Sequence, residues 1–235
     1  MNKTAGSLKH LHELHIQLRQ VNEQLERGPK QIRARRQHVE RKQSEHDALR
    51  DELKQLRMAA DQKSLQLKTN EAKIQELKIK LNSASSNREF DIMKAQIEAD
   101  TMANSVLEDE ILDALDKVDR MQANISTADD DLGKAQSEET RIRGEVEAAE
   151  PRLREQAQEL EASLTNCERD LPGTIMEKYR RLVQAHGADA LAAVENRACT
   201  SCYAILLPNA IVEINTGKSQ FCKSCGRLLY AVPAD

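Results

Sequence analysis

Apolar side chains recur along most of the chain at alternating steps of three and four residues. The first series begins at Leu11 and keeps its register to Leu81. A repeat that averages 3.5 residues keeps one face of a helix turned toward a partner helix, as in coiled coils. The series therefore predicts one long coiled-coil helix. We expect a bend or break at Gly28-Pro29, because proline lacks an N–H and disfavours helical geometry in the residue before it.

Several polar residues lie on or beside this first seam. Arg35, Lys42 and His46 occupy seam positions, and we interpret them as long side chains that reach out of a loosened stalk toward solvent. His12 and His15 lie one turn apart beside the seam. No cysteine or carboxylate arrangement accompanies them, so we interpret them as exposed helical histidines and not as metal ligands.

The six residues 82–87 are small or polar and end the first series. Ser86 and Glu89 match a capping box, which marks the start of a new helix. A second apolar series then runs from Phe90 to Leu153, with polar members at Asp100, Asn104 and Glu139. Two matching series about a short turn predict an antiparallel hairpin in which paired residue numbers add up to about 170. A parallel coiled coil between two chains, which ignores the turn, is the alternative.

The segment after the second series has shorter elements. Leu171-Pro172-Gly173 closes the second helix, and a short helix is expected from about Thr174 to His186, with Gly187 as its stop. Further on, residues 205–207 predict a strand, Pro208 to Gly217 a short helix and residues 228–232 a last strand. Residues 190–194 are expected only to lead into this part.

Four of the five cysteines form two CxxC pairs near the C-terminus. Cys199 with Cys202 and Cys222 with Cys225 are separated by nineteen residues. Two cysteines three positions apart can turn both sulfurs toward one point, and two such pairs complete the tetrahedral S4 shell of a structural zinc ion. Gly226 follows the second pair and permits the positive φ of a tight knuckle. Four thiolates leave no open coordination position, so we expect one structural Zn2+ with no catalytic role.

Two disulfides, or four unrelated core thiols, are the other interpretations of these cysteines. The chain has no secretory character, and in a reducing compartment this pattern favours a metal. The fifth cysteine, Cys167, shares an apolar face with Leu160, Leu164 and Leu171. We therefore expect Cys167 to be a core thiol outside the metal shell.

The composition agrees with long helices and a small core. The 235 residues are 39% hydrophobic and 31% charged, with two Phe, three Tyr and no Trp, and eight glycines and five prolines leave little room for turns. The net charge of −4 argues against nonspecific nucleic-acid coating by the whole molecule. No apolar run of membrane-spanning length and no apolar N-terminal leader is present, which predicts a cytoplasmic protein without membrane insertion.

Charge is unevenly distributed along the predicted hairpin. The basic block in residues 27–42 faces an acidic segment, residues 129–139, so we expect ion pairs between the two helices. Residues 98–116 instead carry seven carboxylates and no Lys or Arg. This acidic block is either a solvated face or a docking strip for a basic partner.

Together these patterns predict a mostly α protein. Residues 1–171 are expected to form the long antiparallel coiled-coil hairpin with its apex at 82–87. Residues 172–196 are expected to form a connector helix, and residues 197–235 a small C4 zinc ribbon. The ribbon has too few apolar residues to fold without help, and we expect the zinc to hold it together. We also expect the hairpin and the ribbon to fold separately.

Four stretches give the chain a family resemblance. They are Asn87-Arg88-Glu89-Phe90-Asp91, residues 107–112, Tyr179, and the ribbon end Cys225-Gly226-Arg227-Leu228-Leu229-Tyr230. With these the chain resembles the bacterial family of coiled-coil proteins with a C-terminal C4-type zinc ribbon. The resemblance implies that the four paired cysteines are zinc ligands. Members of that family are commonly labelled nucleic-acid-binding proteins, and studied relatives are similar to adaptors for an alternative sigma factor or for flagellar transcripts or export components.

Three classes of function follow from these observations. An enzyme is not expected, because the chain lacks a phosphate-binding loop, a nucleophile elbow and a zinc-protease helix. A protein-binding adaptor, with the stalk and the ribbon as docking surfaces, is the favoured interpretation. A nucleic-acid-binding regulator is the alternative, since the ribbon carries Arg197, Lys218, Lys223 and Arg227 besides three aromatic residues, Tyr203, Phe221 and Tyr230. The sequence leaves the oligomeric state open.

Overall fold

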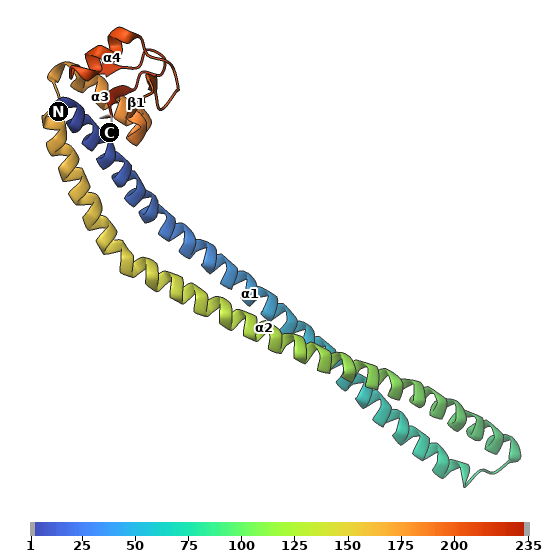
Figure 1. Ribbon diagram of the computed structural model, residues 1–235. Coiled ribbons are helices and arrows are strands. Elements are labelled where there is room, and N and C mark those ends of the chain that lie inside the picture. The colour runs from blue at the N-terminus through green and yellow to red at the C-terminus, as the bar shows by residue number, and fades with distance from the viewer. Residues whose placement is uncertain (1–2, 233–235) are drawn as a thin grey trace. The chain divides into compact units, whose positions relative to one another are not determined.

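The computed structural model describes residues 3–232, with side chains from Gly6 onward. The outermost residues of the predicted hairpin (1–2) and of the predicted ribbon (233–235) lie outside the described residues. The chain is mostly helical, and two long helices, α1 (Lys3–Leu81) and α2 (Asn87–Arg169), precede a small strand-rich part that carries four cysteines. Figure 1 shows α1 and α2 joined by a short turn and running in opposite directions. The predicted fold class is confirmed, and the turn excludes the parallel alternative.

The chain divides into two compact units. The hairpin unit is Arg33–Arg141, and the ribbon unit contains the described residues up to Ile32 and those from Ile142 onward. Each unit therefore includes part of both long helices. The predicted domain boundaries at residues 171 and 196 stay predictions.

The seam of the hairpin unit follows the predicted register. Its most buried apolar side chains lie at predicted seam positions, and they are Leu53, Ala60, Ile74, Ile111, Ile125, Leu132 and Ala135. Burying each large aliphatic side chain contributes roughly 1.5–3 kcal/mol. Phe90 is an exception at 44% exposure, because it lies in the first turn of α2, where the seam ends. The 3.5-residue repeat alone thus located nearly the whole contact surface.

Ion pairs across the seam correct the predicted alignment. Arg35 with Glu138, Lys42 with Asp131 and Lys63 with Glu110 approach to 3.7, 3.2 and 2.9 Å. The paired numbers add up to 173, a shift of three residues from the expected 170. The pairing of the basic block with acidic residues 129–139 is confirmed. The expectation that His46 reaches solvent is wrong, since it is buried at 4% exposure with its Nε2 atom 2.8 Å from Asp129 Oδ1.

The predicted turn and capping box are present. Helix α1 ends at Leu81 and α2 begins at Asn87. The backbone N–H of Glu89 donates to Ser86 Oγ at 3.3 Å, and the Glu89 carboxylate accepts from the backbone N–H of Ser85 at 3.1 Å. The first bond satisfies a donor of the first helical turn, as in a capping box, whereas the carboxylate caps the N–H of Ser85, one residue before the Ser86 N–H of the standard box.

Of the predicted bend or break at Gly28-Pro29, the break is wrong, because α1 continues through Pro29 and α2 likewise continues through Pro151. The bend stays a prediction. A Cβ added to Gly28 would lie 2.7 Å from Val146 Cγ1, so the two helices approach closely there. A cavity of about 270 Å3 lies beside this approach, lined by residues of both helices. Packing against α2 keeps α1 helical although Pro29 lacks a backbone donor. Tertiary packing here outweighs the low helix propensity of proline.

The rest of the ribbon unit consists of short elements. They are α3 (Gly173–His186), a 3-10 turn η1 (Gly187–Ala190), β1 (Leu191–Glu195), β2 (Ala198–Cys199), α4 (Pro208–Asn215), β3 (Gln220–Phe221) and β4 (Leu228–Ala231). The strands form one sheet in the order β2-β1-β4-β3, with β1 parallel to β4 and the other pairs antiparallel. The helix after Pro208, the connector helix and the last strand are confirmed. Within the described part of the chain, no helix is apolar over a long enough stretch to cross a membrane.

Two expectations for this part are wrong. Residues 205–207 form no strand beyond one isolated bridge between Ile205 and Ala198, and Ile205 is 84% exposed. Residues 191–195, expected only as a lead, form β1, which lies inside the sheet between β2 and β4. The sheet thus begins within the segment predicted as connector.

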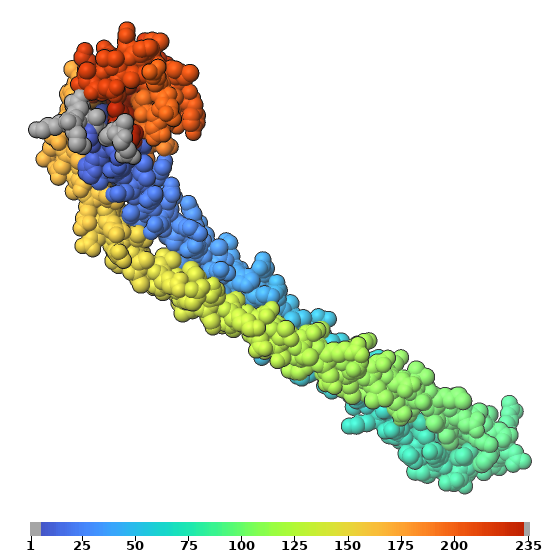
Figure 2. All heavy atoms as spheres, viewed as in Figure 1, coloured from blue at the N-terminus to red at the C-terminus, as the bar shows by residue number. Residues whose placement is uncertain are grey.

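The two faces of the sheet pack on different neighbours. Leu191, Ala193, Leu228 and Tyr230 belong to a core with the first turns of α1, the end of α2 and α3, including Leu11, Leu164, Ile175 and Tyr179. Ala192 and Leu229, from the opposite face, pack with Cys199, Cys222 and Ile214. Figure 2 shows the first turns of α1, in blue, among the yellow end of α2 and the orange and red strand-rich part. The sheet therefore connects the base of the long helices with the cysteine cluster.

Candidate metal centre

Each CxxC pair lies in a knuckle with the same backbone hydrogen bonds. In the first, the N–H of Tyr203 donates to Cys199 O at 2.8 Å and the N–H of Cys199 donates to Ala204 O at 3.1 Å. In the second, the N–H of Gly226 donates to Cys222 O at 2.9 Å and the N–H of Cys222 donates to Arg227 O at 2.8 Å. The two loops are therefore structurally equivalent halves of one site.

The residue after each pair has left-handed backbone geometry. Gly226 has φ of 77°, as the sequence predicts, and Tyr203 occupies the equivalent position with φ of 58°. Such a conformation costs an L-residue with a side chain roughly 1–2 kcal/mol. The first knuckle thus contains a strained tyrosine where the second has glycine. Tyr203 is also 80% exposed.

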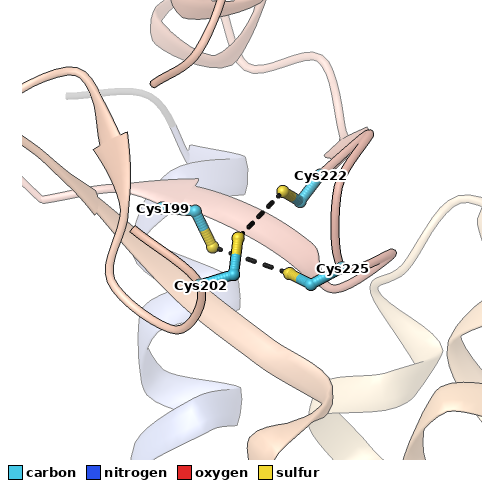
Figure 3. Close-up of side chains that lie close together, drawn as sticks. All are labelled: Cys199, Cys202, Cys222 and Cys225. Atoms are coloured by element: carbon cyan, nitrogen blue, oxygen red, sulfur yellow. Dashed lines mark hydrogen bonds between the residues drawn. The ribbon is translucent and has the colours of Figure 1, made fainter. Parts of the chain in front are cut away.

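The four Sγ atoms converge on one point. They all lie within 4.8 Å of one another, with Cys199 and Cys225 at 3.8 Å and Cys202 and Cys222 at 3.6 Å (Figure 3). These distances exclude a disulfide, whose sulfurs are about 2.05 Å apart. Tetrahedral bonds of about 2.3 Å to one metal ion require sulfurs about 3.8 Å apart. The cluster therefore could hold one metal ion through the four predicted cysteines.

The protein surroundings act differently on the four thiols. Burial raises the pKa of Cys199 to about 12. Burial also acts to raise the pKa of Cys225, but hydrogen bonds from Arg227 and from neighbouring thiols outweigh it and lower that pKa to about 6. Arg227 is itself fixed, because its Nε donates to Asp189 O at 2.7 Å. Since a coordinating cation deprotonates thiols, this guanidinium would offset part of the negative charge of an S4 shell.

The other residues considered from the sequence lie outside the cluster. Cys167 is half-buried against the core of the ribbon unit, as predicted. His15 Nε2 lies 2.7 Å from Tyr179 Oη, and His12 Nδ1 lies 2.8 Å from Tyr230 Oη. The expectation that these histidines are exposed is wrong for both, because His15 is 8% exposed and His12 is half-buried. Among the described residues, the four paired cysteines are the one group of three or more His, Cys, Asp or Glu with converging ligand atoms.

An apolar groove of about 130 Å3 borders the second knuckle. Its lining includes residues 204–207 on one side, residues 220–224 on the other and Leu229. Ile205 and Leu207 are 84% and 60% exposed, and Val212 on α4 is also 60% exposed. Sequence reasoning missed this groove because it assigned residues 205–207 to a strand.

Some of the aromatic and basic side chains of the ribbon are engaged in contacts, whereas Arg197 and Lys223 are exposed. Tyr230 is buried, and the ring of Phe221 lies 3.9 Å from Lys178 Nζ. Lys218 lies 4.0 Å from Glu213, and Arg227 is held by Asp189 as described. Tyr203 is thus the most accessible of the three aromatic residues that the sequence suggested as stacking platforms.

Comparisons with known proteins establish the fold. No family model and no curated protein matches the chain. Among solved structures, the chain is similar to CT398 from Chlamydia trachomatis, with 16% identity and a TM-score of 0.78 over 97% of this chain and 98% of that one. It is also similar to the HP0958 protein from Helicobacter pylori, with 18% identity, a TM-score of 0.62 and 99% coverage of both chains. A protein from Mycobacterium smegmatis matches with 16% identity and a TM-score of 0.57 over 99% of this chain and 100% of that one.

Proposed function

We propose that this protein is a non-enzymatic cytoplasmic adaptor whose ribbon holds one structural zinc ion and docks a protein partner in the neighbouring apolar groove. Four thiolates with near-tetrahedral spacing are the donor set that zinc favours, and they leave no position for substrate. The zinc would fix the two knuckles relative to each other. It would thereby shape the groove wall formed by residues 222–224.

The exposed groove is the observation that carries this proposal. Side chains as apolar as Ile205 and Leu207 are costly to leave in water, at about 25 cal/mol for each Å2 of apolar surface. Grouped exposed apolar residues beside a rigid framework are typical of protein-binding surfaces. Nucleic-acid binding, the alternative, needs free basic side chains and stacking faces. Here Tyr230, Phe221 and Arg227 are engaged within the ribbon unit. Arg197 and Lys223 are exposed, so it is the apolar groove that favours the protein partner.

The sequence resemblance suggests the first partners to test. Studied relatives in the resembled family are similar to adaptors for an alternative sigma factor or for flagellar transcripts or export components. We therefore propose a partner from the transcription or flagellar secretion machinery, and the chemistry of the groove requires that it presents apolar side chains.

Capture from cell lysate by the full chain tests the proposal. We expect the wild-type chain to retain a defined protein after nuclease treatment, and Ile205→Ser with Leu207→Ser to lose the same protein while keeping zinc. The matched control is Leu65→Ser, which changes an apolar side chain 66% exposed on α1. Retention that disappears with nuclease alone would replace the adaptor with the nucleic-acid alternative, and retention by the groove variant would exclude the groove.

A further inference from the structure

Helix α2 carries a second apolar stripe outside its seam. Ile92, Ala95, Ala99, Met102 and Val106 follow one another at alternating steps of three and four residues. All five are exposed, and the three large side chains are 61%, 74% and 59% exposed in sequence order. The stripe lies within the hairpin unit, where α2 already packs against α1 through other residues.

The spacing of the stripe is that of a helix–helix contact. Its neighbours Met93, Ile97, Asn104 and Leu107 are buried or half-buried in the seam with α1, so the stripe lies on the opposite side of α2. Four turns of regular three-four spacing cover about 21 Å at 1.5 Å per residue. One further helix can pack against such a stripe as a coiled-coil neighbour.

The outer face of α1 shows no equivalent stripe. Met58, Leu65, Ala72 and Ile79 recur there only every seventh residue, and the intermediate positions hold Gln62, Thr69 and Glu76. A continuous contact needs apolar residues at both steps of the repeat. The outer face of α1 therefore lacks the three-four apolar pattern, although its large side chains are as exposed as those of the stripe. It provides a matched control for substitutions in the stripe.

Acidic side chains border and extend the stripe on α2. Asp91 and Glu98 each lie one turn before a stripe residue, and Asp109 and Asp113 continue the same face beyond Val106. Among the described residues, none forms an ion pair with these four carboxylates. Lys63 of α1 pairs with a different carboxylate, that of Glu110, at 2.9 Å. The stripe is thus an apolar surface with unbalanced negative charge along its border.

This charge excludes a second copy of the chain as the favoured occupant. Residues 88–116 carry nine carboxylates and two basic residues, Arg88 and Lys94. Antiparallel self-pairing about Ala99 would place Glu98 against Asp100 and Asp109 against Glu89, with Arg88 against Glu110 as the one opposite-charge pair. Parallel self-pairing would place each carboxylate against its own copy. Like charges at such positions oppose association, whereas a basic helix would be attracted and its encounter accelerated.

We infer that this face of α2 binds an amphipathic helix of a partner protein, with apolar residues at three-four spacing and lysine or arginine at the bordering positions. This inference rests on the proposed adaptor function but gives it a second docking surface, separate from the ribbon groove. The partner helix would cover Met102 and Val106 and place its basic residues against Asp109 and Asp113.

A synthetic three-heptad amphipathic peptide with a leucine seam and bordering lysines tests this inference. The fluorescence anisotropy of the labelled peptide is measured with the full chain at low and high salt. A control peptide with the same leucine seam but with bordering glutamates is measured in the same way. We expect the lysine peptide to bind and the glutamate peptide to bind about tenfold more weakly or not at all. Met102→Gln with Val106→Gln should weaken binding of the lysine peptide about tenfold, and Asp109→Asn with Asp113→Asn should reduce its salt dependence. Leu65→Gln with Ile79→Gln on α1 should leave both unchanged.

Three results would overturn the inference. They are no binding of the lysine peptide, equal binding by the Met102 and Val106 variant with unchanged helix content, and a dimer of the full chain that this variant dissociates. Since the ribbon groove is untouched in all these variants, capture of a partner through the groove would persist even if the stripe binds nothing. The two proposals therefore fail separately.

Discussion

Tyr203 and Gly226 follow the two CxxC pairs and share one left-handed backbone conformation. Glycine adopts it without a steric cost, but a residue with a Cβ does so at roughly 1–2 kcal/mol. We predict that Gly226→Ala lowers the free energy of unfolding by about 1–2 kcal/mol. Tyr203→Gly should change it by less than about 1 kcal/mol, because relief of strain offsets the entropy that glycine adds to the unfolded chain. Thermal unfolding followed by circular dichroism, with zinc content as a control, decides this. Equal destabilisation by both substitutions would contradict the equivalence of the two knuckles.

A buried polar network beside the sheet predicts a pH dependence. His15 Nε2 donates to Tyr179 Oη, and Tyr179 in turn donates to Glu168 Oε1 at 2.9 Å. Burial lowers the pKa of His15 and, with Arg19 nearby, that of His12, although Glu168, Asp189 and Glu13 act to raise them. Between these lowered pKa values and the ordinary histidine pKa of 6.5, the unfolded chain therefore binds more protons than the folded chain. The contribution of the two neutral histidines to the free energy of unfolding is complete above pH 6.5 and falls as the pH decreases below it.

The melting temperature of the ribbon unit should accordingly be lower at about pH 5.5 than at about pH 7.5. His12→Gln with His15→Gln should reduce that difference, because glutamine can donate a hydrogen bond but does not titrate in this range. His10→Gln, which changes an exposed histidine on the same helix, serves as the control. If the double variant keeps the full pH dependence, other groups must cause it.

The close approach of α1 and α2 at Gly28 gives a prediction at the scale of the elements. An added Cβ there would lie 2.7 Å from the stiff Val146 side chain, whereas a Cβ on Gly144 would meet nothing within 4 Å. Replacing glycine by alanine inside a helix contributes about 1 kcal/mol where space permits. We predict that Gly144→Ala raises the melting temperature of the ribbon unit and that Gly28→Ala lowers it. Adding Val146→Ala to Gly28→Ala should recover part of the loss, and a stabilising Gly28→Ala alone would show that the helices do not meet there.

The same elements show what the sequence could predict. The seam was located from its repeat, because burial of one helix face depends on spacing alone. The continuity of α1 at Pro29 was not predictable, since it depends on packing against a residue more than a hundred positions away. Strand β1 was missed because its alanines have little preference for strands and because its partner β4 begins at Leu228.

For the candidate site, the cysteines were predictable and their surroundings were not. Spacing within each CxxC pair restricts where the sulfurs can point, so the four residues follow from the sequence. The hydrogen bonds of His12 and His15 join residues 218 and 164 positions apart. The groove depends on residues 205–207 forming no strand beyond the single bridge between Ile205 and Ala198. The left-handed backbone of Tyr203 could have been predicted from the sequence. Tyr203 follows Cys202 as Gly226 follows Cys225, so the two residues hold equivalent positions in the two knuckles.

Within the ribbon unit, one sheet contacts both the base of the long helices and the cysteine cluster. This arrangement revises the expectation that hairpin and ribbon fold separately, because alternate residues of β4 belong to the two cores. We predict that chelation of the metal increases amide hydrogen exchange in β1 and β4 and also in residues 8–18 and 171–183. Residues 33–141, which form their own unit, should exchange as before. A change confined to residues 197–232 would instead support separate folding.

The central claim is that Cys199, Cys202, Cys222 and Cys225 hold one zinc ion, and metal analysis of the purified full chain tests it most directly. We expect one zinc per chain, loss of that zinc in Cys202→Ser and in Cys222→Ser, and unchanged zinc in Cys167→Ser, whose thiol lies in the apolar core. Chain without bound metal, iron in place of zinc, or zinc that survives both knuckle substitutions would contradict the account.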